Sequence, residues 1–394
     1  MRRIPLRAVA AACIVAAGVC FVTGVFIVGL NDKNATERDF IQYWASGKQL
    51  IRAANPYDPV AILQLERSAG LEGFHPKVTY SPPVALFLVW PLGLVSAKTG
   101  LILWLLTLIG CLSVSVWILW LLNGRPSSRL HLFGYVFAPA LACLMAGQLG
   151  IFMLLGLVLF FYLYRLRPFL AGAALLPCAL KPHLFLPFAL VLLLWVVRRK
   201  TYRILAGFFA NLAASCALSL YLDSHVWQQY SETMRTTGVL QAWVPTLSVS
   251  LRFLVDRDAV WLQLVPEAGV CVWAIWYYWV RRDSWSWMRE GLILLLVSTM
   301  CTPYAWFTDE TILLPAVLAG IYRAADSRRL LVFFGLIAGV SLIEVLRSVP
   351  LTSPYYLWTT PAWLAWYLIA TKSEDTCAKE FGPSEATAEN LLSR

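Results

Sequence analysis

Long apolar runs separated by short polar segments dominate this sequence. Runs of roughly 15 to 25 apolar residues match helices that cross the hydrocarbon core of a bilayer, and we count about twelve of them. The expected ranges are 8–30, 97–122, 132–147, 149–164, 168–180, 184–197, 204–222, 260–280, 290–302, 310–322, 331–346 and 355–370. The pattern therefore predicts an all-α polytopic membrane protein.

Two apolar segments need separate treatment. The run at 8–30 follows three arginines and is too long for the hydrophobic part of a signal peptide, so we expect an uncleaved first helix with its N-terminus inside. The shorter piece at 84–95 lies after Pro82 and Pro83 and contains Pro91. Proline on both sides favours a re-entrant or interfacial helix over a full span.

Composition and charge agree with a membrane protein. Apolar residues make up 59% of the chain and charged residues only 14%, which excludes an ordinary soluble domain. The net charge of +10 comes largely from arginines and lysines in the short segments assigned to the inside, as in 198–203 and 281–289. This distribution follows the positive-inside rule, so the charge indicates orientation and not a nucleic-acid partner.

Two long loops are assigned to the outer face, at 31–80 and 223–259. Both contain amphipathic stretches, and in the first loop Phe40, Trp44, Leu50 and Ile51 share one helical face. We expect these helices to lie along the membrane surface with that face in the interface. The predicted membrane domain covers residues 1–370, and 371–394 is expected to form a disordered cytoplasmic tail because it is rich in Glu, Ser, Ala and Thr.

The first outer loop holds the leading catalytic candidate, Asp39. A carboxylate there could take the proton of a sugar hydroxyl as that hydroxyl attacks an anomeric carbon. The alternative is a helix N-cap, since Asp starts helices well and the residues after it look helical. Tyr43 and Trp44 suit stacking on a sugar or anchoring at the membrane interface. The segment Asn55-Pro56-Tyr57-Asp58-Pro59 is a turn signal.

Further polar candidates lie at the ends of apolar segments. Lys181 is placed at the outer membrane face, where an unpaired charge is costly, and its ammonium could neutralise a donor phosphate. The alternative is a lysine that snorkels at a helix end. His183 could add a hydrogen-bond donor, and Gln148 either binds sugar hydroxyls or bonds a neighbouring helix.

The remaining candidates are charged residues of the second loop and of a later helix start. Arg252 is suited to phosphate but could equally be a solvated loop charge. Asp309 and Glu310 are rivals to Asp39 for the base, or they stabilise a helix N-terminus. We find no metal-ligand spacing, no internal repeat and no nucleotide-binding motif, so we expect neither metal nor cofactor and a donor substrate that comes from the membrane.

The stretch DFIQYWASGKQLIRAANPYDP resembles the first-loop signature of glycosyltransferase family 87, the alpha-mannosyltransferase-like proteins. Tyr80-Ser81-Pro82-Pro83, Gly147-Gln148, Leu180-Lys181-Pro182-His183 and Thr302-Pro303-Tyr304-Ala305-Trp306 are also similar. The resemblance implies the GT-C membrane fold, polyprenyl-phosphate sugar donors, inversion without metal, and Asp39 as the matching acidic base. It also places Tyr80 among the substrate-binding residues.

These observations give one leading hypothesis. It is a glycosyltransferase that moves a hexose, with mannose as first choice, from a polyprenyl-phosphate donor to a glycolipid or polysaccharide acceptor. The family leads us to expect a bacterial inner membrane with the site facing the periplasm. The alternatives are a transporter or flippase of lipid-linked saccharides, which would show repeats and midplane polar residues, and a non-catalytic assembly protein.

Overall fold

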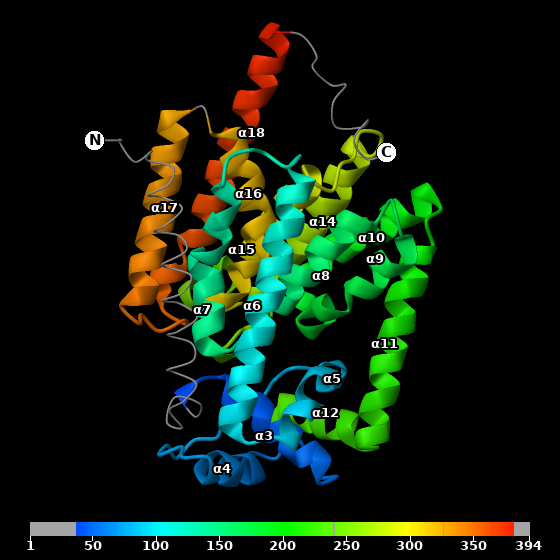
Figure 1. Ribbon diagram of the computed structural model, residues 1–394, viewed down its shortest axis with the longest axis vertical. Helices are drawn as coiled ribbons and strands as arrows, with labels where there is room; N and C mark the ends of the chain where they lie inside the picture. The colour runs from blue at the N-terminus through cyan, green and yellow to red at the C-terminus, as the bar shows by residue number, and fades with distance from the viewer. Residues whose placement is uncertain (1–36, 239–240, 326, 382–394) are drawn as a thin grey trace, which may run out of the picture. The chain divides into compact units, whose positions relative to one another are not determined.

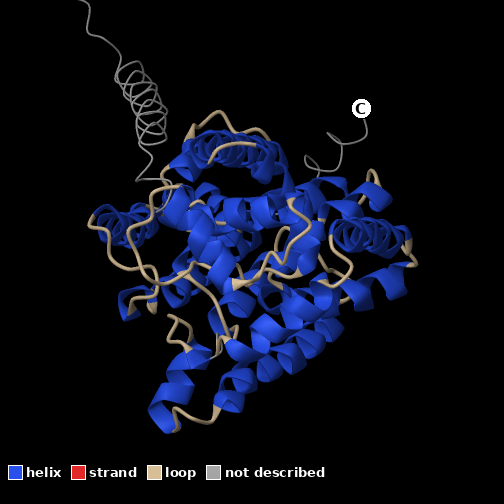
Figure 2. Ribbon diagram, turned by 90° about the horizontal axis from the view of Figure 1, so that it is seen from below, coloured by secondary structure: helices blue, strands red, loops and turns tan. Residues whose placement is uncertain are grey.

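The computed structural model describes residues 37–381 except 239–240 and 326, so the predicted helix at 8–30 and residues 382–394 lie outside it. Within the described residues every regular element is helical (Figure 2). The chain divides into two compact units. Of the described residues, unit 1 comprises those within 37–109 and 218–233, and unit 2 those within 110–217 and 234–381. Two of the boundaries between the units fall within helices labelled in Figure 1, α6 (Ala97–Leu122) and α11 (Arg203–Leu222).

Unit 1 is built around α3 (Phe40–Ile51), which lies in the first loop that the sequence assigned to the outer face. The other elements of the unit are α4 (Pro59–Ser68), η1 (Pro83–Ala85), α5 (Leu86–Val89), η2 (Trp90–Leu94), the first half of α6, the end of α11 and most of α12 (Val226–Thr236). The elements of residues 83–94 are short, as the flanking prolines predicted.

The apolar face of α3 packs against protein, which corrects the prediction that it lies in the membrane interface. Phe40, Trp44 and Leu50 are at most 5% exposed, and the Trp44 Nε1–H donates to the Val95 carbonyl at 3.0 Å. Only Ile51 of the predicted face is exposed, at 41%. Burial of large side chains inside unit 1 therefore holds this helix in place.

Two glycines bring α3 and η2 together backbone to backbone. A Cβ on Gly47 would lie 2.3 Å from the Val89 carbonyl oxygen, and one on Gly93 would lie 2.2 Å from the Gly47 carbonyl oxygen. Because the obstructing atoms are backbone atoms, a side chain at either position cannot be accommodated by a rotamer change. The glycine in the ASGKQL segment is therefore required by packing.

We expect Gly47→Ala to destabilise the protein by about 3 kcal/mol, the upper range for overpacking, because α3 must move away from η2. Chemical denaturation of the protein in detergent micelles measures the loss. Gly110→Ala is the matched control: nothing lies within 4 Å of its Cβ, and in helix α6 the change should be neutral or slightly stabilising. Equal stabilities for the two variants would contradict the close approach.

The segment after α3 is a turn followed by a capped helix. The Asn55 side-chain oxygen accepts the Tyr57 N–H at 2.8 Å, and Asp58 accepts the Val60 N–H at 2.9 Å as the N-cap of α4. Tyr57 is fully buried, and its hydroxyl donates to the Ser81 carbonyl at 3.0 Å. The structure thus gives this motif the turn role that its residues indicated.

Helix α4 carries a buried carboxyl group at Glu66. Both of its carboxyl oxygens accept the Lys77 backbone N–H, at 3.2 and 3.1 Å, and burial raises the pKa of Glu66 from 4.5 to about 7. Because the folded-state pKa lies above the unfolded value, the protonated form stabilises the fold at low pH. This contribution is lost as the pH rises from about 4.5 through about 7.

Glu66→Gln should flatten the pH dependence of stability across this window. At about 1.4 kcal/mol for each pKa unit, the wild type should lose about 3 kcal/mol more than the variant between pH 4.5 and pH 8. Thermal unfolding at a series of pH values tests this. Parallel curves for the two proteins would show that Glu66 ionises as it does in the unfolded chain.

Unit 2 contains the remaining helices, and α8, α10, α15 and α17 lie within three residues of the predicted ranges. They are η3 (Leu130–Tyr135), α7 (Ala138–Ala146), α8 (Gly150–Leu163), α9 (Pro168–Ala174), η4 (Leu176–Leu180), η5 (Pro182–Phe185), α10 (Leu186–Arg199), α13 (Leu247–Val255), η7 (Val260–Gln263), α14 (Leu264–Arg281), α15 (Glu290–Cys301), η8 (Phe307–Leu313), α16 (Leu314–Arg323), α17 (Arg328–Leu346), η9 (Pro354–Tyr356) and α18 (Thr359–Phe381). Helix α18 continues past residue 370, where we expected the tail to begin.

Five described helices are long and apolar enough to cross a membrane, which supports membrane association. They cover Ala97–Leu122, Pro182–Arg199, Arg203–Leu222, Val260–Arg281 and Arg328–Leu346. Five further apolar segments are shorter, at 10–17 residues. The predicted count of about twelve spans is therefore not reached among the described residues, because proline and glycine divide several apolar runs into shorter helices.

Candidate active site

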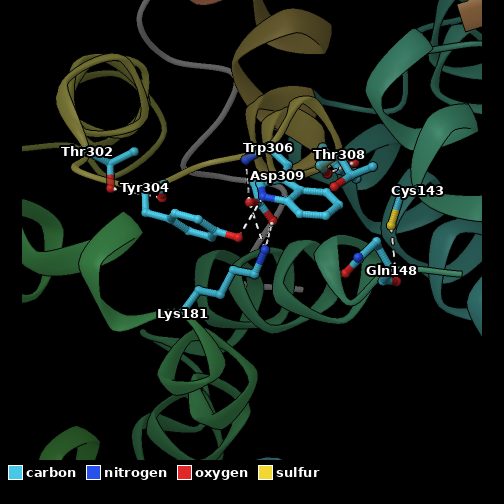
Figure 3. A network of polar contacts seen from close by, with 9 residues as sticks. Cys143, Gln148, Lys181, Thr302, Tyr304, Trp306, Thr308 and Asp309 are labelled. Atoms are coloured by element: carbon cyan, nitrogen blue, oxygen red, sulfur yellow. Dashed lines mark hydrogen bonds and ion pairs between the residues drawn. The ribbon is translucent and has the colours of Figure 1, made fainter. Parts of the chain in front are cut away.

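A buried ion pair between Lys181 and Asp309 is the centre of the candidate site in unit 2. The Lys181 Nζ lies 2.8 Å from both carboxylate oxygens of Asp309 (Figure 3). The lysine side chain is 15% exposed and the aspartate 1%. The structure thus gives Lys181 a partner, whereas the sequence left it as a snorkelling residue or a phosphate ligand.

Local breaks in the helices place the two charges. Lys181 lies in the break between η4 and η5, with φ −138° and ψ 73°, because the following Pro182 disfavours a helical conformation at residue 181. Asp309 lies in the first turn of η8, and its Oδ2 accepts the Trp306 N–H at 2.9 Å. Asp309 therefore also satisfies a backbone donor at a helix start, the structural role that its position suggested.

Tyr304 of the Thr302–Trp306 segment lies beside the ammonium group. The Lys181 Nζ lies 6.0 Å from the Tyr304 ring centroid, within reach of a cation–π contact. The Trp306 Nε1–H donates to the Tyr304 hydroxyl at 2.7 Å (Figure 3). His183 meets Tyr304 edge to face at 5.9 Å, and its Nε2 is shielded from solvent without a hydrogen-bond partner. The site thus combines one ion pair with a polar aromatic wall.

Gln148 joins this site through the turn between α7 and α8. The Cys143 thiol donates to the Gln148 carbonyl at 3.2 Å, and the Gln148 side chain is 5% exposed. A Cβ on Gly150 would lie 2.6 Å from the Thr308 carbonyl oxygen, so α8 begins directly against η8. Gly150 therefore allows the Gln148 turn to approach the segment that carries Asp309 (Figure 3).

Two predicted candidates of unit 2, Arg252 and Glu310, bind partners outside the Lys181–Asp309 pair. Arg252 is 1% exposed, its guanidinium donates to the Gln241 carbonyl at 2.8 Å, and it lies 4.8 Å from the Phe253 ring centroid. It is therefore not a solvated loop charge. Glu310 is 4% exposed, and its Oε1 lies 2.5 Å from the Thr359 hydroxyl. Adjacent in sequence, Asp309 and Glu310 thus have different partners.

The other predicted site residues belong to unit 1. Asp39 is half-buried at the N-cap position of α3, but its side chain makes no capping hydrogen bond. Tyr43 packs against Trp104 with ring centroids 5.5 Å apart, and Tyr43 and Trp44 are both at most 5% exposed, so the structure gives these rings a packing role. Tyr80 is 39% exposed.

A scan against protein families gives the decisive comparison. The model of glycosyltransferase family 87 matches residues 79–303, more than half of the 394 residues. The chain belongs to glycosyltransferase family 87. No curated protein and no solved structure matches it. Membership in family 87 indicates glycosyltransferase activity, and no finding supports the transporter interpretation.

The family 87 match includes Tyr80, Gln148, Lys181, His183 and Arg252 and ends before Asp309. Sequence reasoning missed the part played by Tyr304 and Trp306, although both stand in a motif that resembled the family. The signal was an aromatic pair beside a proline between two apolar helices. Tyr304 and Trp306 supply aromatic rings, a hydroxyl and an indole N–H beside a buried charge.

Proposed function

We propose that this family 87 glycosyltransferase moves a hexose from a polyprenyl-phosphate donor to a glycolipid or polysaccharide acceptor. Mannose is the hexose that we propose. The acceptor hydroxyl attacks the anomeric carbon as the bond from that carbon to the phosphate oxygen breaks, and polyprenyl phosphate leaves. This single displacement inverts the anomeric centre. The proposal places the reaction at the outer face of a bacterial inner membrane.

Asp39 is the proposed general base, and the hydrogen bonding of the rival carboxylates supports this choice. Asp309 has both oxygens on the Lys181 ammonium and one of them also on the Trp306 N–H. Those contacts commit both carboxylate oxygens to holding the lysine and the start of η8. Glu310 is buried beside Thr359. Asp39 is half-buried at the start of α3, and it is the acidic residue that opens the first-loop segment resembling the family signature.

Lys181 is the proposed contact for the leaving phosphate. An ammonium has three N–H groups, and two of them are directed to the Asp309 oxygens. In this role Asp309 fixes the position of Lys181, and the remaining N–H stabilises the charge that develops on the donor phosphate. Gln148 and His183 are the proposed contacts for sugar hydroxyls.

The test is sugar transfer by the purified protein. Radiolabelled mannose and glucose are offered on polyprenyl phosphate and, in parallel, on a nucleoside diphosphate, with a membrane lipid extract as acceptor. We expect labelled product only from the lipid-linked donors, unaffected by a metal chelator. Product from nucleotide sugars alone would overturn the proposed donor, and loss of activity with the chelator would overturn metal-independent transfer.

A further inference from the structure

A cluster of positive side chains lies at one end of unit 2, where α10 and α14 finish and α15 begins. Helix α10 packs against both other helices. Six cationic residues stand there against the two acidic residues Asp283 and Glu290, a net charge of +4. The six are Arg198, Arg199, Lys200, Arg281, Arg282 and Arg289. The candidate active site uses none of them.

This cluster is distant from the Lys181–Asp309 pair. Helix α10 has 14 residues and begins five positions after Lys181, whereas Arg198 lies in its last turn. At 1.5 Å per residue the helix alone separates the two ends by about 20 Å. The basic cluster therefore marks the opposite end of the helical unit, which the charge pattern assigns to the inside of the membrane.

Two arginines of the cluster converge on one anion. The carboxylate of Asp283 is paired with the Arg198 guanidinium, and its other oxygen lies 3.9 Å from the Arg282 Nε. Asp283 is 77% exposed, and the two arginines are 42% and 32% exposed. An exposed acidic side chain thus occupies a position to which guanidinium groups from two segments are directed. Guanidinium groups in this arrangement also match phosphate oxygens.

Helix α14, which leads to Arg282, has an exposed apolar face. Val272, Ile275, Trp276, Trp279 and Val280 of α14 are 42% to 70% exposed. Their spacing repeats with the helical period, and α14 belongs to one of the five candidate spans. The Arg282 guanidinium lies 4.6 Å from the Trp279 ring centroid, and it donates to the Trp279 carbonyl at 2.6 Å. Acyl chains suit this face, and a charged head group suits the arginines at its end.

We propose that Arg198 and Arg282 bind the phosphate of an anionic glycerophospholipid, and that Asp283 occupies this position when the lipid is absent. The apolar face of α14 carries the acyl chains. The arginines alone would accept any phosphate, and the apolar face alone would accept any lipid. A ligand that fits both must combine a phosphate with long hydrocarbon chains. The inference depends on membrane insertion of α14 and is independent of the proposed sugar transfer.

Native mass spectrometry of the purified full-length protein measures the binding of phosphatidylglycerol and of phosphatidylcholine with the same acyl chains. We expect phosphatidylglycerol to bind at least tenfold more tightly. Arg198→Gln and Arg282→Gln should each weaken its binding about fivefold, from about 1 kcal/mol per basic residue at a membrane surface. Asp283→Asn should strengthen it, because the competing carboxylate is removed.

The matched control is Arg328→Gln with Arg329→Gln, which removes two exposed arginines at the start of α17, on the same predicted side of the membrane. This variant should bind phosphatidylglycerol as the wild type does. An equal loss in the control would mean general surface attraction and would overturn the site. Glycerol 3-phosphate that displaces the lipid at equal affinity would identify a site for soluble phosphate instead. Asp283→Asn is a surface change. Weaker binding of phosphatidylglycerol by this variant would overturn the proposal that Asp283 competes with the lipid phosphate.

Discussion

Asp39→Asn is expected to reduce sugar transfer by about 10²- to 10⁴-fold, the usual contribution of a general base. The amide keeps the size of the side chain but cannot accept the proton of the acceptor hydroxyl. Thermal unfolding of the variant, measured alongside, separates a loss of catalysis from a loss of fold. Initial rates with the lipid-linked donor, at saturating acceptor, measure the effect as a loss in kcat.

The matched control is Glu37→Gln, which changes the same type of charge on an exposed residue two positions earlier. It should retain nearly full activity. A fully active Asp39→Asn variant would remove Asp39 as the base. If Asp309→Asn were then inactive while still folded, the role would pass to the carboxylate beside Lys181.

Lys181→Met is expected to destabilise the protein by about 3 to 5 kcal/mol, since it leaves the buried Asp309 carboxylate without its cation. Asp309→Asn should cost a similar amount through the unpaired ammonium. The double variant should be more stable than either single one, because it removes both charges. It should nevertheless remain inactive, since no ammonium is left to neutralise the phosphate.

Chemical denaturation of the four proteins gives the coupling energy of the pair. Arg198–Asp283 is the exposed counterpart in the same unit, and Asp283→Asn should cost at most about 1 kcal/mol. Additive losses for Lys181 and Asp309 would contradict a buried pair. A fully active double variant would show that the pair serves the fold alone.

Helix positions were largely predictable because long apolar runs are a local signal. The range 97–122 coincides with α6, and 204–222 differs from α11 by one residue. The face that a helix buries was less predictable. For α3 the apolar stripe was identified, but the same stripe suits a membrane interface and a protein neighbour equally well. The glycines at 47 and 93 indicate the protein neighbour only once their contact is known.

The candidate site was predicted as a set of residues and not as a network. The cost of an unpaired charge at Lys181 was evident from its apolar surroundings. Its partner could not be identified, because Asp309 lies 128 positions away and several other carboxylates stand in outer segments. Pairing of this kind is set by the packing of α8 against both η4 and η8, which no local pattern encodes.

The close approach at Gly47 and Gly93 restricts both the motion and the evolution of the segment that carries Asp39. Because α3 touches η2 through backbone atoms, α3 cannot open as a separate flap, and any opening must carry residues 83–94 with it. A larger residue at one glycine cannot be compensated by a smaller residue at the other, because the other position already has no side chain. Both positions are therefore expected to accept only glycine.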